Sequence, residues 1–495
     1  MGIKALLSLP FAKFIVLKNN RWKYHALTSQ QKIMKQLLRR SQNTVFGKEH
    51  SFRKIQNYTD FKKHIPIRDY EGLKPYFEKI ISGEKNVLWP GKPIYLCKTS
   101  GTTSGVKYIP ISNESMPNQI TAARDAILSY IAETKNTSII NGKMIFLQGS
   151  PKLSKSGGVL TGRLSGIVAH HIPFYLIKNR LPSFETNCIV DWEKKVDAIV
   201  KETISEKMSV ISGIPPWVKM YFEKLQKKSG MLIKDLFPNF NLFIYGGVNY
   251  APYKRSFEKL IGKNVDSIEL YPASEGFIAY QDSQKEEGML LCVNHGIFYE
   301  FVAADEFFDR DPKRVSLVDV KIGVNYILIL NTNAGLWGYN IGDTIKFVSI
   351  NPYRIIVSGR IKHFTSAFGE HVIVEEVEKS LKKALDKIPV QINEFHVAPQ
   401  ISPKKGLPYH EWLIEFEKEP ENITAFELLI DTSLQKQNPY YKDLISGKVL
   451  RPLKITIIGK EGFRKYMKSL GKLGGQNKVP RLANDRKIAD KITMF

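Results

Sequence analysis

The sequence has few cysteines and no long apolar run. Its three cysteines, Cys97, Cys188 and Cys292, are odd in number and far apart. Such spacing excludes a disulfide framework and a CxxC-type zinc site, and it favours a protein of the reducing cytoplasm. No stretch approaches ~20 uninterrupted apolar residues, so we expect no transmembrane segment.

One early segment, residues 5–17, is apolar enough to resemble the core of a signal peptide faintly. Lys13 interrupts it, no A-x-A cleavage site follows, and Leu6 departs from the myristoylation pattern that begins at Gly2. We therefore expect a packing helix. Contact of this segment with a membrane surface is the alternative that the residues leave open.

Acidic residues are in deficit: 73 Lys and Arg face 48 Asp and Glu, which gives a net charge of +25 and a pI near 9.6. This excess is compatible with nucleic acid, anionic lipid or phosphate-bearing ligands. The lysines are spread along the chain, usually one or two at a time, and clustered arginines with interleaved aromatics are lacking. We expect a well-solvated surface and no nucleic-acid partner. A basic RNA- or lipid-binding protein on a degenerate enzyme scaffold is the alternative from another class.

The remaining composition predicts a folded chain of more than one domain. The 495 residues are 43% hydrophobic and 11% aromatic, with no low-complexity linker. The first ~90 residues have helical patterns. Apolar strands at 144–148, 209–211 and 242–245 then alternate with helices such as those at 192–203 and 216–227, as in a layered α/β sheet. A β-meander follows residue 294, and Ser358-Gly359-Arg360 has the character of a hinge. We predict an α/β N-terminal domain over residues 1–359 that includes a β-meander or barrel subdomain, and a small mobile α+β domain over 360–495.

The strongest local signal is Lys-Thr-Ser-Gly-Thr-Thr-Ser-Gly-Val-Lys at residues 98–107. Gly101 and Gly105 let successive backbone N–H groups turn toward an anion, the hydroxyls add donors, and Lys107 adds positive charge. The register is not that of a Walker A loop. A triphosphate would suit this nest.

This loop resembles the phosphate-binding loop of the adenylate-forming superfamily, which includes acyl-CoA synthetases, adenylation domains and luciferases. Four further segments follow in the order of the superfamily's motifs. Residues 246–248 are similar to its glycine pair, and residues 271–276 to its Tyr-Gly-x-Thr-Glu motif. Residues 339–343 are similar to its Tyr-x-x-Gly-Asp motif, and residues 358–362 to its Gly-Arg hinge. Residues 84–95, 99–110 and 476–481 resemble more closely the Gretchen Hagen three family of auxin-responsive-promoter proteins, in a bacterial-type form. Members of that family conjugate acyl acids to amino acids.

The resemblance implies a role for each matched residue. The residues expected to bind phosphate are Ser100, Gly101, Thr102, Thr103, Gly105 and Lys107. Those expected on the adenine side are Gly247, Val248, Tyr271 and Ser274. Glu275 is expected to bind Mg²⁺, Asp343 the ribose hydroxyls, Arg360 the ribose or a phosphate, and Lys478 the α-phosphate. Each has a plain structural alternative: local backbone bonding for Asp343, a solvated carboxylate for Glu275, a core aromatic for Tyr271 and an exposed charge for Lys478.

By the same resemblance, ATP and Mg²⁺ would activate a small carboxylic acid as its acyl-adenylate, and an amino acid amine would accept the acyl group. Thioester formation with coenzyme A is the alternative acceptor reaction. A neutral histidine could take the amine proton, and His170, His171 and His363 are candidates, although a structural role is more common for such residues. Residues 364–370 depart from the acidic segment of plant members, so the plant acceptor site does not transfer directly.

Overall fold

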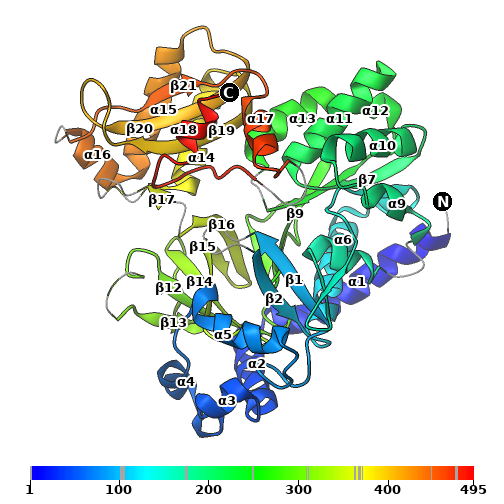
Figure 1. The fold of residues 1–495 in the computed structure, drawn as a ribbon. Helices are drawn as coiled ribbons and strands as arrows, with labels where there is room; N and C mark the ends of the chain where they lie inside the picture. The colour runs from blue at the N-terminus through cyan, green and yellow to red at the C-terminus, as the bar shows by residue number, and fades with distance from the viewer. Residues whose placement is uncertain are drawn as a thin grey trace. The chain divides into compact units, whose positions relative to one another are not determined.

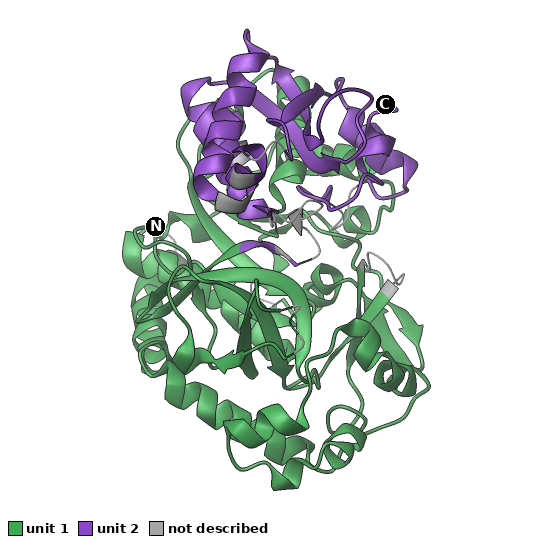
Figure 2. Ribbon diagram, turned by 90° about the vertical axis from the view of Figure 1, so that its left-hand side faces the viewer, with its two compact units in different colours: residues 1–248, 260–357 green, residues 249–259, 358–495 purple. Residues whose placement is uncertain are grey.

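The computed structural model describes two compact units, which Figure 2 colours separately. The described residues are 3–100, 106–172, 177–247, 250–307, 309, 311–361, 364–365, 370, 372–446, 449–473 and 478–495. The larger unit contains residues 1–248 and 260–357, and the smaller one contains 249–259 and 358–495. The clustering of residues 249–259 with the C-terminal part of the chain was not predicted. A mobile domain beginning at residue 360 stays a prediction.

Helices form the N-terminal part of the larger unit, as the sequence predicts (Figure 1). They are α1 (Ile3–Lys23), α2 (Ala26–Ser41), α3 (Val45–Glu49), α4 (Tyr58–His64) and α5 (Tyr70–Ile81). Three of them begin at a side chain that accepts a backbone N–H, namely Thr44, Asn57 and Asp69. The buried face of α2 carries apolar residues three and four apart, including Ile33 and Leu37. The apolar face of α2 thus packs into a buried cluster of the larger unit.

A small mixed sheet follows, with the order β2-β1-β5-β4. Its strands are β1 (Tyr95–Ser100), β2 (Val106–Ile111), β4 (Ser154–Ser156) and β5 (Val159–Gly162). β1 and β2 pair in antiparallel register, whereas β1 and β5 are parallel. The glycine-rich segment therefore connects two adjacent strands of one hairpin.

The main sheet combines the predicted α/β strands and the predicted meander in one layer. Among the described residues its order is β13-β12-β14-β15-β16-β11-β10-β9-β8-β7-β3-β6. The parallel strands are β3 (Lys143–Phe146), β6 (Arg180–Leu181), β7 (Met208–Ser212), β8 (Leu242–Gly246) and β9 (Asp266–Ala273). The remaining strands are β10 (Gly276–Tyr280), β11 (Met289–Leu291), β12 (Ile297–Ala303), β13 (Arg314–Ser316), β14 (Asn325–Thr332), β15 (Tyr339–Ile350) and β16 (Tyr353–Arg360). The meander thus continues the parallel part of the sheet.

Helices cross over between the parallel strands and bury apolar faces. The predicted helices are observed as α10 (Trp192–Thr203) and α11 (Pro215–Ser229), and a longer helix, α6 (Met116–Thr134), packs against β9 and β10. Aliphatic and aromatic side chains of α1, α6 and the sheet form one buried cluster. Their burial, at roughly 25 cal/mol per Å² of apolar surface, is the main stabilising term for this unit.

The smaller unit has a three-stranded sheet in the order β19-β20-β21. The strands are β19 (Gln391–Gln400), β20 (Tyr409–Lys418) and β21 (Lys454–Ile457), and the helices that pack against them include α14 (Val374–Lys387) and α15 (Ile423–Gln437). This matches the α+β pattern predicted for the tail. Within the parts of the chain that the structure describes, no helix is long and apolar enough to cross a bilayer.

Candidate active site

The glycine-rich segment is held at both ends by the β1–β2 hairpin. Ser100 lies opposite Val106, and Thr99 lies opposite Lys107. Four predicted phosphate-binding residues lie outside the described residues: Gly101, Thr102, Thr103 and Gly105. The backbone of Ser100 is described, but its side chain is not. The hairpin places the two residues that flank the segment, Ser100 and Val106, opposite each other.

The pleat of this hairpin separates its two lysines. Directly paired residues of an antiparallel ladder point to the same face, and neighbours along a strand point to opposite faces. Lys107 and Thr99 therefore share the face of Cys97, whereas Lys98 is on the other face, where its Nζ lies 3.2 Å from Ser154 Oγ. The Lys107 ammonium lies 5.3 Å from the ring centroid of Tyr70. Of the two lysines, Lys107 is therefore the one on the face that carries Cys97, the residue that contacts Ser274 of the 271–276 motif.

The contact with that motif is made by Cys97. Its thiol donates a hydrogen bond of 3.1 Å to Ser274 Oγ, across 177 residues of sequence. Burial raises the pKa of the Cys97 thiol to about 12, so the group is a neutral donor at physiological pH. This hydrogen bond joins β1, the strand that leads into the glycine-rich segment, to the 271–276 motif that contains Ser274 and Glu275.

The residues Ser274 and Glu275 form a two-residue hairpin turn between β9 and β10. Ala273 and Gly276 are paired on either side of it, and Gln119 of α6 donates a hydrogen bond of 3.0 Å to the Ala273 carbonyl. A two-residue turn leaves its side chains little freedom. The half-buried Glu275 carboxylate is accordingly fixed beside the strand that carries Cys97 and Thr99.

Two further predicted site residues meet directly. Tyr271 of β9 donates its hydroxyl to Asp343 Oδ2 at 2.5 Å. The structure places Gly342 and Asp343 in a bulge of β15, not in a turn between strands, and one residue of β14 opposes residues 341–343. Gly342 has φ +85°, a left-handed value that disfavours other residues. The bulge re-aims the Asp343 carboxylate, as bulges next to functional sites commonly do.

The glycine pair after β8 has a steric explanation. A Cβ on Gly246 would lie 2.4 Å from the carbonyl oxygen of Leu270 on β9, so only glycine permits this close strand pairing. Gly247 follows with φ +74° and is exposed. Val248 lies outside the described residues. Gly247 thus begins a turn at the carboxyl end of β8, an edge at which α/β sheets bind ligands.

Two predicted residues belong to the smaller unit, Arg360 and Lys478. The Arg360 backbone ends β16, and its side chain is not described. Lys478 is exposed and precedes a segment that pairs with β19, through Val397 N–H to the Arg481 carbonyl at 2.9 Å and Ala483 N–H to the Val397 carbonyl at 2.9 Å. The residues after Lys478 are therefore held against a buried strand, and this attachment fixes the position of the Lys478 backbone within the smaller unit.

Side chains strengthen that attachment. His396 Nδ1 lies 2.6 Å from the Pro480 carbonyl, and burial lowers the His396 pKa to about 4, so the ring is neutral and donates this bond at pH 7. Arg481 pairs with Glu394, and its guanidinium lies 4.5 Å from the ring centroid of Phe395. These contacts hold the residues that follow Lys478 against β19.

The histidines do not join these motifs. His171 Nε2 lies 2.9 Å from the Tyr95 hydroxyl, at the opposite end of β1 from the glycine-rich loop, and His170 bonds the Pro151 carbonyl at 2.9 Å. Burial lowers the pKa of His171. These contacts favour structural roles for the pair. His363 lies outside the described residues.

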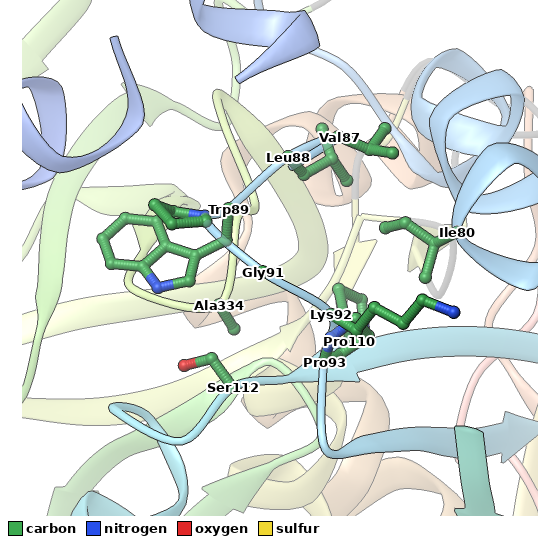
Figure 3. Close-up of a pocket in the computed structure, with 11 residues that line it drawn as sticks. Ile80, Val87, Leu88, Trp89, Gly91, Lys92, Pro93, Pro110, Ser112 and Ala334 are labelled. Carbon is green, nitrogen blue, oxygen red and sulfur yellow. The ribbon is translucent and has the colours of Figure 1, made fainter. Parts of the chain in front are cut away.

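Two cavities of the larger unit lie apart from the motifs. One, of about 10 Å³, lies under the turn-rich residues 87–93 and holds no more than a water molecule (Figure 3). The other is an open groove of about 400 Å³. Its lining residues are Ile94, Asn113, Met116, Pro117, Ile120, Thr121 and His171. Neither cavity is lined by the predicted nucleotide residues.

Family models match most of the chain in three parts. They are the GH3 family N-terminal domain over residues 20–190, the central domain over 290–360 and the C-terminal domain over 375–487. The chain belongs to the GH3 family. GH3 is the Gretchen Hagen three family that the sequence motifs predicted, and the prediction is thereby confirmed.

Similar proteins are enzymes of plants. A jasmonoyl-L-amino acid synthetase of Nicotiana attenuata is 23% identical over 64% of this chain and 66% of its own length. An indole-3-acetic acid-amido synthetase of Arabidopsis thaliana is 20% identical over 94% and 90% of the two chains. The alignment thus spans just under two thirds of the first relative and nine tenths of the second.

Solved structures confirm the fold class. The GH3.15 acyl acid amido synthetase superposes with a TM-score of 0.78 at 15% identity, covering 96% of this chain and 95% of that one. A 2-hydroxyisobutyryl-CoA ligase in its postadenylation state superposes with a TM-score of 0.58 at 12% identity, covering 95% and 92%. Both comparisons show that this GH3 chain shares the fold of these two enzymes.

Sequence reasoning missed the residues that support the predicted ones. Cys97, Gln119 and Tyr70 contact the loop strands or the acidic turn, yet each stands in an ordinary apolar or amphipathic pattern. The pairing of Cys97 with Ser274 depends on strand register across 177 residues. No spacing rule predicts such a contact.

Proposed function

We propose that this GH3 chain is an ATP-dependent acyl-acid amido synthetase that forms an acyl-adenylate and passes the acyl group to an amino acid. Family membership and the adenylate-forming fold support the ligase class. The single observation that carries the proposal is the convergence of separate motifs: Cys97 with Ser274, and Tyr271 with Asp343. If the glycine-rich segment were an unrelated polar loop, its strand would have no need to contact the other predicted motifs.

The proposed nucleotide contacts follow from the side-chain chemistry. Asp343 could accept two hydrogen bonds from vicinal ribose hydroxyls, with its orientation fixed by the Tyr271 hydroxyl, and the Tyr271 ring would lie beside the adenine. Lys107 and the hydroxyls of the glycine-rich loop would bind the phosphates. Arg360 and Lys478 would also contact the nucleotide.

Mg²⁺ fits this set of residues. No group of three His, Cys, Asp or Glu gathers as a metal cluster within the described ranges. Mg²⁺ bound to a nucleotide commonly takes one or two protein carboxylates and completes its shell with phosphates and waters. Glu275, fixed in its hairpin turn, would supply such a carboxylate. The ion would neutralise charge on the phosphates.

The first half-reaction places a carboxylate oxygen of the substrate on the α-phosphorus, and pyrophosphate leaves. Negative charge spreads over the phosphoryl oxygens, so cations and N–H donors that are already in position lower the barrier. Lys107 and Lys478 are the cations proposed for this task. The second half-reaction forms the amide and releases AMP.

The named relatives act on jasmonate and indole-3-acetate, and a structure of the GH3.15 enzyme holds 2,4-DB. We infer a small carboxylic acid with an apolar body as the acyl substrate and an amino acid as the acceptor. A cytoplasmic location suits both substrates and the three unpaired cysteines.

ATP–pyrophosphate exchange over a panel of carboxylic acids tests the first half-reaction, because it requires no acceptor. Exchange that depends on one class of acid is expected. AMP release is then measured with that acid and either amino acids or coenzyme A. Release only with coenzyme A would replace the amide assignment by thioester formation, and exchange with none of the acids would contradict adenylation itself.

A further inference from the structure

The N-terminal helix α1 (Ile3–Lys23) has two apolar faces, and only one of them is covered by the larger unit. Ala12, Ile15 and Trp22 belong to the core cluster that includes residues of α6. Figure 1 shows α1 lying alongside α6 at the edge of the unit. Asn19 donates a hydrogen bond of 2.8 Å to Asp125 of α6. The helix is thus firmly held by one side.

The other side exposes large apolar side chains. The exposed fractions are 66% for Leu6, 62% for Leu7, 48% for Phe11, 61% for Phe14 and 67% for Leu17. Elsewhere in the described residues, large exposed apolar side chains occur singly or in short pairs along the sequence. We call these five residues the α1 face. Burying them in water-free surroundings would be favourable, and an apolar patch of this kind marks an interaction site.

Helical geometry places the α1 face on one arc. At 100° per residue, Leu6, Leu17, Phe14, Leu7 and Phe11 follow one another around roughly 140° of the helix. Lys13 lies at one border of this arc. Lys18 and Arg21 continue the same side of the helix one and two turns beyond Phe14, and all three basic residues are exposed. Basic residues that border an apolar arc can extend along it while their ammonium groups stay in a polar layer.

Charge decides which partner fits. Residues 1–48 contain ten Lys or Arg and no Asp or Glu, which is a large share of the net charge of +25. Within α1, Lys13, Lys18 and Arg21 are exposed, whereas Lys23 is paired with Asp282 at 2.8 Å. The segment that carries the α1 face is therefore positively charged and contains no carboxylate side chain of its own.

We propose that α1 is a binding surface for anionic phospholipid bilayers, with the α1 face of residues 6–17 in the acyl region and Lys13, Lys18 and Arg21 at the headgroups. Helices with an apolar face bordered by Lys or Arg bind in this way. If a second copy of the chain covered the α1 face with its own, the basic residues of the two α1 helices would come together, and α1 has no acidic residue to neutralise them. A nucleic acid would satisfy the lysines and leave the leucines and phenylalanines uncovered.

The proposal adds a location to the enzyme and does not depend on its proposed activity. Because α1 is already folded and packed against α6, binding orders no disordered segment. The helix lies on the bilayer rather than across it, in agreement with the finding that no described helix is suited to span one. Acyl substrates with apolar bodies partition into the same layer.

The test is vesicle co-sedimentation of the full chain at low salt. Phosphatidylcholine vesicles are compared with vesicles that contain about one third phosphatidylglycerol, a proportion at which each nearby Lys or Arg adds measurable attraction. We expect binding to the anionic vesicles, weakened by salt. Phe11→Gln/Phe14→Gln should lower the partition coefficient by about 10- to 100-fold. Lys13→Gln/Lys18→Gln should lower it by about 5-fold for each lysine on anionic vesicles.

Matched controls carry equal changes at exposed positions elsewhere. Val190→Gln/Val318→Gln replaces two exposed apolar residues, and Lys404→Gln/Lys405→Gln replaces two exposed lysines. Both should bind vesicles as the wild type does. Thermal melting verifies that each variant is folded.

Three results would overturn the proposal. The first is wild-type protein that stays in the supernatant with anionic vesicles. The second is a folded Phe11→Gln/Phe14→Gln variant that binds vesicles like wild type, because binding would then rest on charge alone. The third is light scattering that shows a wild-type dimer converted to monomer by the same variant without vesicle binding, which would assign the α1 face to a second copy.

Discussion

The hydroxyl of Tyr271 donates a hydrogen bond of 2.5 Å to the carboxylate of Asp343, 72 residues further along the chain. Tyr271 is near the end of β9, and Asp343 is in the bulge of β15. Each was predicted to contact the nucleotide, and the bond shows that they lie together. The tyrosine therefore has a second function besides its ring: it orients the carboxylate.

Removing that hydroxyl should weaken ATP binding modestly. Tyr271→Phe loses a hydrogen bond to a carboxylate, so we expect a loss of about 1 kcal/mol in binding, whereas Asp343→Ala should lose about 2–3 kcal/mol. Calorimetric titration with ATP measures both. Tyr130→Phe is the matched control, because Tyr130 donates to Asp266 at the other end of β9 at 2.6 Å. Equal weakening by the control, or unchanged affinity in Asp343→Ala, would contradict the assignment.

The pleat of the β1–β2 hairpin distinguishes two neighbouring lysines. Lys107 shares the Cys97 face, and Lys98 is on the other one. We expect Lys107→Gln to slow acid-dependent pyrophosphate exchange by about 10²–10³-fold, the usual cost of losing a contact to developing charge. Lys98→Gln removes the same charge from the other face and should retain activity near wild type. A larger effect at Lys98 would reverse the assignment.

The Glu275 carboxylate can be tested through its metal dependence. Glu275→Gln keeps the volume and the turn but removes a hard anionic ligand, so activity should fall and added Mg²⁺ should restore part of it. Titration of exchange activity with Mg²⁺ measures the shift. Glu287→Gln, an exposed carboxylate on the chain between β10 and β11, is the control and should behave as wild type. A Glu275→Gln enzyme with an unchanged Mg²⁺ midpoint argues against metal binding there.

The order of elements was largely predictable because apolar periodicity reports which faces are buried. The predicted helix at 192–203 is α10 with the same bounds, and the strand at 242–245 is β8 extended by one residue. Both segments bury side chains at their own period, 3.6 or 2. Local pattern therefore sufficed wherever a single face or a short apolar run decides the structure.

Contacts at the candidate site were less predictable because they depend on register between distant strands. The motif fixed the identities of Tyr271 and Asp343, but the bulge that presents Asp343 results from the pairing of β15 with β14. Likewise, Cys97 is an ordinary buried residue in sequence and a donor to Ser274 in the fold. The clustering of residues 249–259 with the smaller unit is also tertiary: there the Tyr253 ring lies 5.6 Å from the Arg481 guanidinium.

His396 should make stability fall with acidity. Its pKa is about 4 in the folded chain because burial disfavours the charged ring, against about 6.5 when unfolded. The unfolded state thus binds the proton first, and the stabilisation is complete above pH ~6.5 and lost as the pH falls toward 4. The contribution lost by pH 5 is about 2 kcal/mol.

Chemical unfolding at pH 7.5 and pH 5 measures this loss. His396→Gln, which can still donate to the Pro480 carbonyl, should be less sensitive to this pH change than wild type by that amount. His25→Gln, at an exposed position, should retain the wild-type dependence. Identical pH dependence of wild type and His396→Gln would show that the ring is not neutral in the fold.

The last prediction separates the two half-reactions through Lys478. This lysine is exposed, and the residues after it are fixed to β19 by main-chain bonds from Val397 and by the His396–Pro480 contact. If it contributes positive charge at the α-phosphate only during adenylation, Lys478→Ala should slow adenylate formation by about 10²–10³-fold. The same variant given a pre-made acyl-adenylate should transfer the acyl group at the wild-type rate, since on this hypothesis Lys478 is no longer at the phosphate when AMP leaves. Rapid-quench measurement of each step, with the exposed Lys472→Ala as control for lost charge, decides the matter. Equal losses in both steps would mean that Lys478 acts by holding the smaller unit in shape, and its attachment to β19 would then be the reason.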